Sequence, residues 1–208
     1  MSTDIFIRSW SRLANFFDFS EDKRKLITQL LQAYEQPQRY YHTLQHLGEC
    51  LQWLEAVYQD LQNPSTVELA LWFHDVIYES TAKDNEEQSA DLFCTLFENH
   101  LSPELVQQVC YWILCTKQHQ STTDHDLKIL LDIDLAILGA SSARFFEYEI
   151  QIQHEYSWVD FSIYRSKRAQ ILNEFYQQTP LYQTHFFQDN LEQQAKQNLE
   201  NYLKILRA

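Results

Sequence analysis

The sequence predicts an all-α fold built from roughly ten helices. Apolar residues recur at three- and four-residue spacing through most of the 208 residues, and no stretch of useful length alternates as a strand would. Glycine and proline are scarce, at 2 and 4 residues, which leaves few tight turns and argues against a sandwich or barrel. With 45% hydrophobic residues, the chain can bury a core, and its length suits a single domain over residues 1–208.

The net charge argues against one class of function, binding of a nucleic-acid duplex, and the cysteine pattern argues against disulfides. A net charge of −13 argues against holding a nucleic-acid duplex by general phosphate attraction, although a local metal ion or a few arginines would still bind a small anion. The cysteines lie in apolar helical patterns without a Cys-x-x-Cys pair, which favours reduced, packed thiols in a cytoplasmic protein. They are Cys50, Cys94, Cys110 and Cys115.

Targeting and membrane segments are not expected. Residues 1–4 lack the basic region and the long apolar run of a signal peptide. No window approaches the roughly 20 apolar residues of a membrane span. The oligomeric state is left open by the sequence, with a homodimer among the alternatives.

The first part of the chain predicts four helices. They cover residues 4–17, 22–35, 44–59 and 65–78. Pro37 ends the second helix, and residues 39–42 connect it to the third. The pattern Ser65-x-x-Glu68 is a capping box that opens the fourth helix. Eight of the ten residues 69–78 are apolar or aromatic, so this helix is expected to be buried on most of its face.

Six further helices are predicted after a polar loop at residues 80–85. They cover residues 86–99, 103–117, 126–138, 142–156, 160–178 and 188–206. Ser102 and Pro103 form an N-cap and first-turn pair, and Gly139 stops the nearly all-apolar helix before it. Pro180 separates the last two helices.

Ionisable residues interrupt two of the apolar helical patterns. His42 and His46 are four residues apart, the spacing of residues on one helix face. His46 lies within the amphipathic helix, and His42 falls just before it. His74 and Asp75 stand side by side in the central apolar stretch. Burying a carboxylate without a partner costs several kcal/mol, so the doublet requires an ion pair or a metal ion.

A third segment carries two aspartates, Asp132 and Asp134, in the apolar helix expected at residues 126–138. Residues two apart on a helix point to nearly opposite sides, so one aspartate is expected to face the interior. Asp134 has apolar neighbours three and four residues away, whereas Asp132 has Lys128 as a natural exposed partner. Asp134 is therefore the expected inward residue, with Asp132 as the alternative ligand.

These residues together favour a metal site over the simpler interpretations. Each pair alone would be explained by a buried His–Asp hydrogen bond or by polar residues on a helix surface. Two imidazoles and two carboxylates from three helices instead form a nitrogen and oxygen donor set. Such a set suits a divalent ion such as Mn, Fe, Zn, Co, Ni or Mg.

The same residues resemble the H…HD…D pattern of the HD-domain superfamily of metal-dependent phosphohydrolases. Five motifs are similar to those of an uncharacterised bacterial branch of that superfamily, and the likeness covers nearly the whole chain. The motifs are residues 41–47, 72–75, 84–86, 116–119 and 131–139. The resemblance implies an all-α helical bundle. It also implies four metal ligands, His46, His74, Asp75 and Asp134.

The resemblance further implies catalytic roles. His42 stands where related cyclic-nucleotide phosphodiesterases, with a similar Tyr-His-Asn-x-x-His, place a general acid, although Thr43 replaces that asparagine here. Glu79 or Glu86 would orient or deprotonate the attacking water. The implied reaction is hydrolysis of a nucleotide or other small phosphate ester, with a metal-activated water attacking phosphorus.

Three residues are candidates for substrate binding. His119 follows a helix and begins a loop, so it would contact substrate or simply lie on the surface. Lys117 and Arg168 are candidate phosphate contacts. Arg168 belongs to the basic cluster at residues 164–168, for which a solvated helix face is the simpler interpretation.

Two other functions compete with hydrolysis. One is a non-catalytic, metal-stabilised nucleotide-binding or regulatory module. The other is a di-iron oxygenase of the HD type, which usually needs two further histidine ligands between the doublet and the last aspartate. Only His100, His119 and His125 lie there, without a convincing pair.

Overall fold

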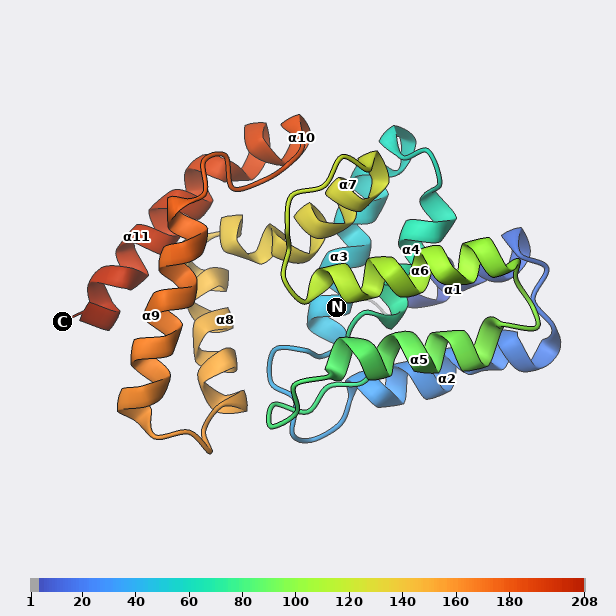
Figure 1. The fold of residues 1–208 in the computed structure, drawn as a ribbon, viewed down its shortest axis with the longest axis horizontal. Helices are drawn as coiled ribbons and strands as arrows, with labels where there is room; N and C mark the ends of the chain where they lie inside the picture. The colour runs from blue at the N-terminus through green and yellow to red at the C-terminus, as the bar shows by residue number, and fades with distance from the viewer. Residues whose placement is uncertain (1–3, 208) are drawn as a thin grey trace. The chain divides into compact units, whose positions relative to one another are not determined.

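The computed structural model describes residues 4–207, and this range is helical without strands (Figure 1). The predicted all-α class is confirmed. The described residues form eleven α-helical segments, one of which has only three residues, in line with the roughly ten expected. None of these helices is both long and apolar enough to cross a membrane. The expectation that the chain lacks a signal peptide rests on residues 1–4, of which residues 1–3 lie outside the described part.

The chain clusters into two compact units, residues 1–133 and 134–208, which are described separately. The single domain expected from the sequence stays a prediction. The division falls at the end of helix α7, whose last residue is Asp134. Because Asp134 continues that helix, it is described together with α7.

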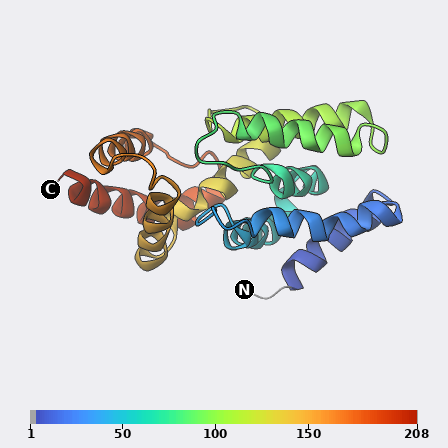
Figure 2. The same ribbon diagram turned by 90° about the horizontal axis from the view of Figure 1, so that it is seen from below.

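The first unit is organised around α4. Its helices are α1 (Asp4–Phe16), α2 (Glu21–Tyr34), α3 (Leu44–Val57), α4 (Pro64–Phe73), α5 (Asn85–Phe97), α6 (Pro103–Thr116) and α7 (His125–Asp134), with a 3-10 turn η1 (Tyr58–Asp60). Helix α4 contacts α1, α3, α5 and α6, and Figure 2 shows it between the α1–α2 layer and the α5–α6 pair. Every residue from Ser65 to Phe73 is buried, as the apolar sequence predicts.

A polar network inside this core replaces the predicted capping box. Helix α4 begins at Pro64 rather than at Ser65, with Asn63 as its N-cap. The fully buried Glu68 carboxylate accepts hydrogen bonds from both forks of the Arg12 guanidinium and, at 2.5 Å, from the Ser9 hydroxyl. Glu68 therefore links α4 to α1 and does not cap its own helix.

The end of α4 also differs from the prediction. The α-helix stops at Phe73, although the apolar sequence continues to residue 78. The His74 N–H still donates to the Ala70 carbonyl, and the Val76 N–H then donates to the Phe73 carbonyl in a turn. The His74-Asp75 doublet therefore lies in the turn after the helix and not inside the helix.

The second unit contains the C-terminal helices. They are the 3-10 helix η2 (Leu135–Gly139), α8 (Ser142–Glu155), α9 (Phe161–Gln177), α10 (His185–Phe187), the π-helical turn η3 (Gln188–Glu192) and α11 (Gln193–Arg207). Helix α11 packs against α9, α8 and η2. The single helix expected at residues 126–138 is thus an α-helix that ends at Asp134 and continues as η2.

Gly139 provides a stability test of this second unit. A Cβ atom at this position would lie 2.6 Å from Leu191 Cβ and 2.9 Å from the Tyr182 hydroxyl oxygen. Gly139→Ala is therefore expected to lower the free energy of unfolding by about 1–3 kcal/mol through overpacking. Urea denaturation followed by circular dichroism measures this, and an unchanged midpoint would contradict the close packing.

Candidate metal centre

Two histidines from neighbouring elements of the first unit approach each other through their Nε2 atoms. His46 lies in the first turn of α3, whose N-cap Thr43 accepts a hydrogen bond from the Gln45 N–H at 3.2 Å. His74 directly follows the last residue of α4. The two Nε2 atoms are 3.1 Å apart, and the side chains are only 3% and 1% exposed.

The Asp75 carboxylate completes a triangle with the two imidazoles. Its Oδ2 atom lies 3.4 Å from His46 Nε2 and 3.1 Å from His74 Nε2. Two ligand atoms that are each about 2.1 Å from one ion lie about 3.0 Å apart at a right angle and about 3.4 Å apart at the tetrahedral angle. The separations within the triangle therefore suit three ligands of one divalent ion.

A backbone contact sets the protonation of His74. Its Nδ1 atom is 2.8 Å from the Leu71 carbonyl oxygen, which can only accept a hydrogen bond. Nδ1 therefore carries a proton, and in the neutral ring the lone pair belongs to Nε2, the atom that faces His46 and Asp75. Metal-binding histidines usually have this arrangement, in which the outer nitrogen donates to a carbonyl or carboxylate.

The surroundings of the Asp75 carboxylate favour its ionised form. Burial on its own raises the pKa of this group. In the absence of an ion, the charges that His74 and His42 carry when protonated, and the hydrogen bonds that the protonated triangle imidazoles donate, hold the pKa well below its usual range. An ionised carboxylate is the form that binds metals. The side chain is 14% exposed, more than either triangle imidazole, so solvent reaches the centre on this side.

A donor cluster of four side chains shares the two histidines of the triangle and has Cys50 and Asp134 in place of Asp75. Candidate ligand atoms of His46, Cys50, His74 and Asp134 all lie within 4.8 Å of one another. This largely buried cluster could hold a metal ion. All four cysteines are free thiols, as expected, but Cys50 was expected only to pack. Its position one helical turn after His46 is the sequence signal that could have identified it.

The aspartates of α7 differ in burial from the expectation. Asp132 is 1% exposed, whereas Asp134 is half-buried, so the interpretation of Asp132 as an exposed partner of Lys128 is wrong. The reason is that α7 is buried on nearly all sides, with every residue from Asp126 to Ile133 except Lys128 buried. Asp134 is nevertheless the aspartate within the donor cluster.

Arg39 holds the turn that carries the doublet, a role that sequence reasoning missed. Its guanidinium is buried and donates from Nη1 to the carbonyls of Asp75 (2.6 Å) and His42 (3.1 Å), and from Nη2 to the carbonyl of Val76 (2.9 Å). The same group lies 5.3 Å from the centre of the Tyr34 ring. Arg39 lies in the connection between α2 and α3, and its hydrogen bonds fix this connection to the turn at the end of α4.

Replacing Arg39 is expected to weaken the centre without removing a ligand. Arg39→Met leaves the carbonyls of the turn without their charged donor, so Asp75 loses its fixed position. Divalent-metal affinity should fall by about 10–100-fold, the usual effect of losing a group that orients ligands. Arg24→Met is the matched control, because Arg24 also donates to backbone carbonyls, those of Phe19 and Ala14. Equal metal affinities in both variants by isothermal titration calorimetry would contradict this role.

His42 lies beside the triangle, as a general acid would. Its ring stacks on Tyr78 at a centroid distance of 3.8 Å and lies 6.0 Å from the ring of His46. It is half-buried, and its charge contributes to the low pKa of Asp75. The stacked ring therefore lies next to the triangle without being one of its three corners.

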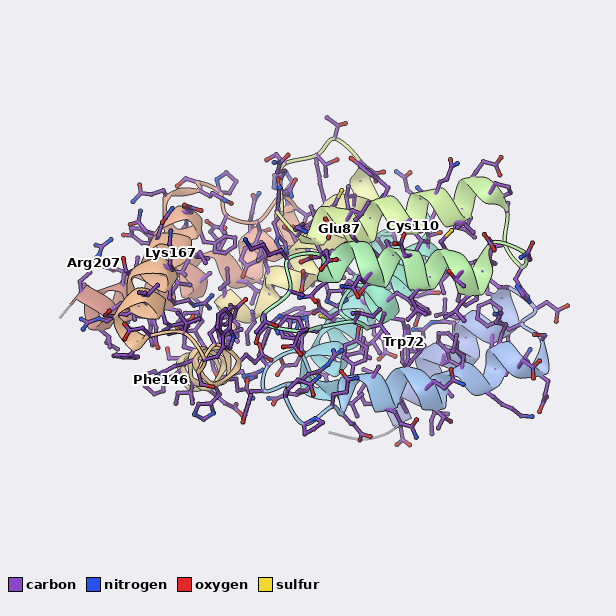
Figure 3. The ribbon with its side chains drawn as sticks, turned by 60° about the horizontal axis from the view of Figure 1, so that its bottom comes forward. Trp72, Glu87, Cys110, Phe146, Lys167 and Arg207 are labelled. Atoms are coloured by element: carbon purple, nitrogen blue, oxygen red, sulfur yellow. The ribbon has the colours of Figure 1, made fainter. Side chains whose placement is uncertain are left out.

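The predicted catalytic glutamates have different surroundings. Glu79 is exposed in the loop after the doublet, where its N–H is bound by the Asn85 side chain at 3.0 Å. Glu86 lies 3.4 Å from the Lys117 ammonium, which also contacts Glu87 (labelled in Figure 3) at 2.7 Å. The hydrogen bond with Glu87 raises the pKa of Lys117. The charge of Lys117 is therefore already shared by two carboxylates.

The other two candidate substrate contacts are His119 and Arg168. His119 is half-buried just after α6 and has a φ of 48°, in the left-handed region. Arg168 belongs to the second unit, is 8% exposed, and donates to both carboxylate oxygens of Glu149 at 2.9 and 2.7 Å. A solvated helix face is therefore the wrong interpretation for Arg168, whose charge is used in a buried ion pair.

No protein-family model, curated protein or solved structure matches this chain. The proposed function therefore rests on the side-chain geometry of the triangle and the donor cluster.

Proposed function

We propose that this chain is a metal-dependent phosphohydrolase that acts on a nucleotide or another small phosphate ester, as its resemblance to the HD-domain superfamily implies. The observation that carries the proposal is the triangle of His46 Nε2, His74 Nε2 and Asp75 Oδ2, with edges of 3.1–3.4 Å. Asp134 supplies a further oxygen donor. This donor set fits a divalent ion such as Mn, Fe, Zn, Co, Ni or Mg.

In the proposed hydrolysis of a phosphate ester, different side chains bind the metal ion, donate a proton and orient the attacking water. A bound divalent ion supplies charge neutralisation for a phosphate oxygen and lowers the pKa of water. Asp75 and the buried imidazoles of His46 and His74 would hold that ion in a fixed place. His42 donates a proton to the leaving oxygen from its position beside the centre. Glu79 orients the attacking water, because the alternative carboxylate, Glu86, is paired with Lys117.

Two of the three candidate substrate contacts stay in the proposal, Lys117 and His119, and both belong to the first unit. His119 is retained as a contact for the phosphate or the leaving group. Lys117 would reach a phosphate only by exchanging its contacts with Glu86 and Glu87. Arg168 is not retained, because Glu149 already binds its guanidinium.

Phosphate release from a panel of nucleotides and phosphate monoesters and diesters tests the proposal. Chelator-treated protein should be inactive and should regain turnover with one or more of the divalent ions named above. His46→Ala and Asp134→Ala should abolish turnover, whereas His42→Ala should lower kcat by about 10²–10⁴-fold, the usual contribution of a general acid. The exposed His100 provides the control variant, His100→Ala, which should stay active.

A protein that binds metal but hydrolyses nothing in the panel would contradict the proposal. Stabilisation by nucleotides without turnover would then favour the metal-stabilised binding or regulatory module.

A further inference from the structure

We infer that Cys50 is a thiolate ligand of the metal ion in this centre and that it makes the site select Zn²⁺, Fe²⁺ or Co²⁺ over Mg²⁺ and Mn²⁺. The inference rests on the proposed metal centre and adds a sulfur donor to the nitrogen and oxygen set that the sequence indicated. The sequence predicts only a packing role for Cys50, whereas the structure places its sulfur in the donor cluster.

The Cys50 sulfur atom is buried beside the His46 imidazole. Cys50 lies on α3, one turn after His46, and is 1% exposed. Its Sγ atom is 3.7 Å from His46 Nδ1 and 3.8 Å from His46 Nε2, the nitrogen that belongs to the triangle. It also lies within 4.8 Å of the donor atoms of His74 and Asp134. Helix α3 therefore contributes both the His46 imidazole and the Cys50 thiol to the donor cluster.

The distances agree with a shared ion. A zinc ion holds nitrogen at about 2.1 Å and sulfur at about 2.3 Å, which places the two donors about 3.6 Å apart at the tetrahedral angle. The observed distance between His46 Nε2 and Cys50 Sγ is 3.8 Å. Because Sγ is almost as far from His46 Nδ1, at 3.7 Å, it faces the imidazole ring and not the Nε2 lone pair. A rotation of the Cys50 side chain about its Cα–Cβ bond would therefore be needed to bring both donors onto one ion.

The chemistry of the donors gives the selectivity. Thiolate is a soft ligand that Zn²⁺ and related transition metals accept, whereas Mg²⁺ and Mn²⁺ prefer carboxylate, carbonyl and water oxygens. Coordination removes the thiol proton, so Cys50 adds a negative charge to those of Asp75 and Asp134. This charge would favour a dication in a site whose histidines are almost completely buried.

The other cysteines provide matched controls. Cys110 lies on α6, where its thiol donates to the Ala90 carbonyl at 3.4 Å, and it is labelled in Figure 3. Burial and the neighbouring Cys94 raise the pKa of Cys110 to about 11. Cys110→Ser therefore removes a thiol of this chain outside the donor cluster.

Co²⁺ titration of the chelator-treated full chain, followed by absorption spectroscopy, tests the inference. Thiolate bound to Co²⁺ gives a charge-transfer band in the near ultraviolet, while the d–d bands in the visible report the ion whatever its ligands. The wild type and Cys110→Ser should show both sets of bands. Cys50→Ser should keep the visible bands, lose the near-ultraviolet band, and lose at least about 10-fold in Zn²⁺ affinity with unchanged Mn²⁺ affinity.

The outcomes separate this inference from the proposed function. Visible bands without a charge-transfer band in the wild type would overturn the role of Cys50 and leave the metal centre in place. A charge-transfer band that persists in Cys50→Ser would overturn the assignment to this cysteine. If the wild type gives no cobalt bands, the metal centre and the inference both fail. Circular dichroism spectra of both variants, matched to the wild type, show that the comparison is made on folded protein.

Discussion

His74→Ala is expected to abolish tight binding of divalent metal. The change removes one corner of the triangle, the imidazole whose free nitrogen is set by the Leu71 carbonyl. It also leaves Asp75 and His46 without the partner that lies 3.1 Å from each of them. The loss of affinity should exceed the 10–100-fold that removing an orienting group costs. Equilibrium dialysis followed by elemental analysis measures the metal that remains bound.

His100→Ala is the control for this prediction. His100 is exposed just after α5, so the variant loses an imidazole that the donor cluster does not contain. It should bind metal as the wild type does. Retention of metal by His74→Ala at the wild-type level would leave the His74-Asp75 pair as a structural contact only.

Arg168→Met is expected to cause the largest loss of stability in the second unit. Arg168 and Glu149 have side chains that are 9% and 0% exposed, and they form a bidentate ion pair. Removing the arginine leaves a buried carboxylate without its partner, which costs about 3–5 kcal/mol. Urea denaturation followed by circular dichroism measures the change.

A control variant and a double variant show whether the unpaired Glu149 carboxylate causes the loss of stability in Arg168→Met. Lys167→Met removes an exposed cation from the same helix and should change the stability by less than about 0.5 kcal/mol. Adding Glu149→Leu to Arg168→Met should restore most of the loss, since apolar replacements of buried ion pairs are often neutral. A double variant as unstable as the single one would contradict this explanation.

Most helix bounds could be predicted from the sequence because local signals mark them. Ser102 and Pro103 start α6 as expected, with the Ser102 hydroxyl accepting from the Leu105 N–H at 3.3 Å. The end of α4 could not be predicted, because the sequence stays apolar past Phe73. The turn after that helix is held by Arg39, 36 residues earlier than Asp75, and contacts so distant in sequence leave no local pattern.

The candidate site was predictable to the extent that its residues stand out from apolar surroundings. His46, His74 and Asp75 interrupt apolar patterns, and the structure brings them together. Cys50 could not be distinguished in this way, because a cysteine among apolar residues is usually a packing residue. The burial of Asp132 was missed because helical periodicity assumes one exposed side, and α7 has almost none.

Anomalous diffraction from crystals of the wild-type chain soaked with Zn²⁺ would test the metal centre most directly. Data collected on both sides of the zinc absorption edge locate the ion independently of any activity. The account predicts one strong peak about 2.1 Å from the Nε2 atoms of His46 and His74 and from an Asp75 oxygen. A map with no peak at this triangle, or with peaks only at surface carboxylates, would contradict it.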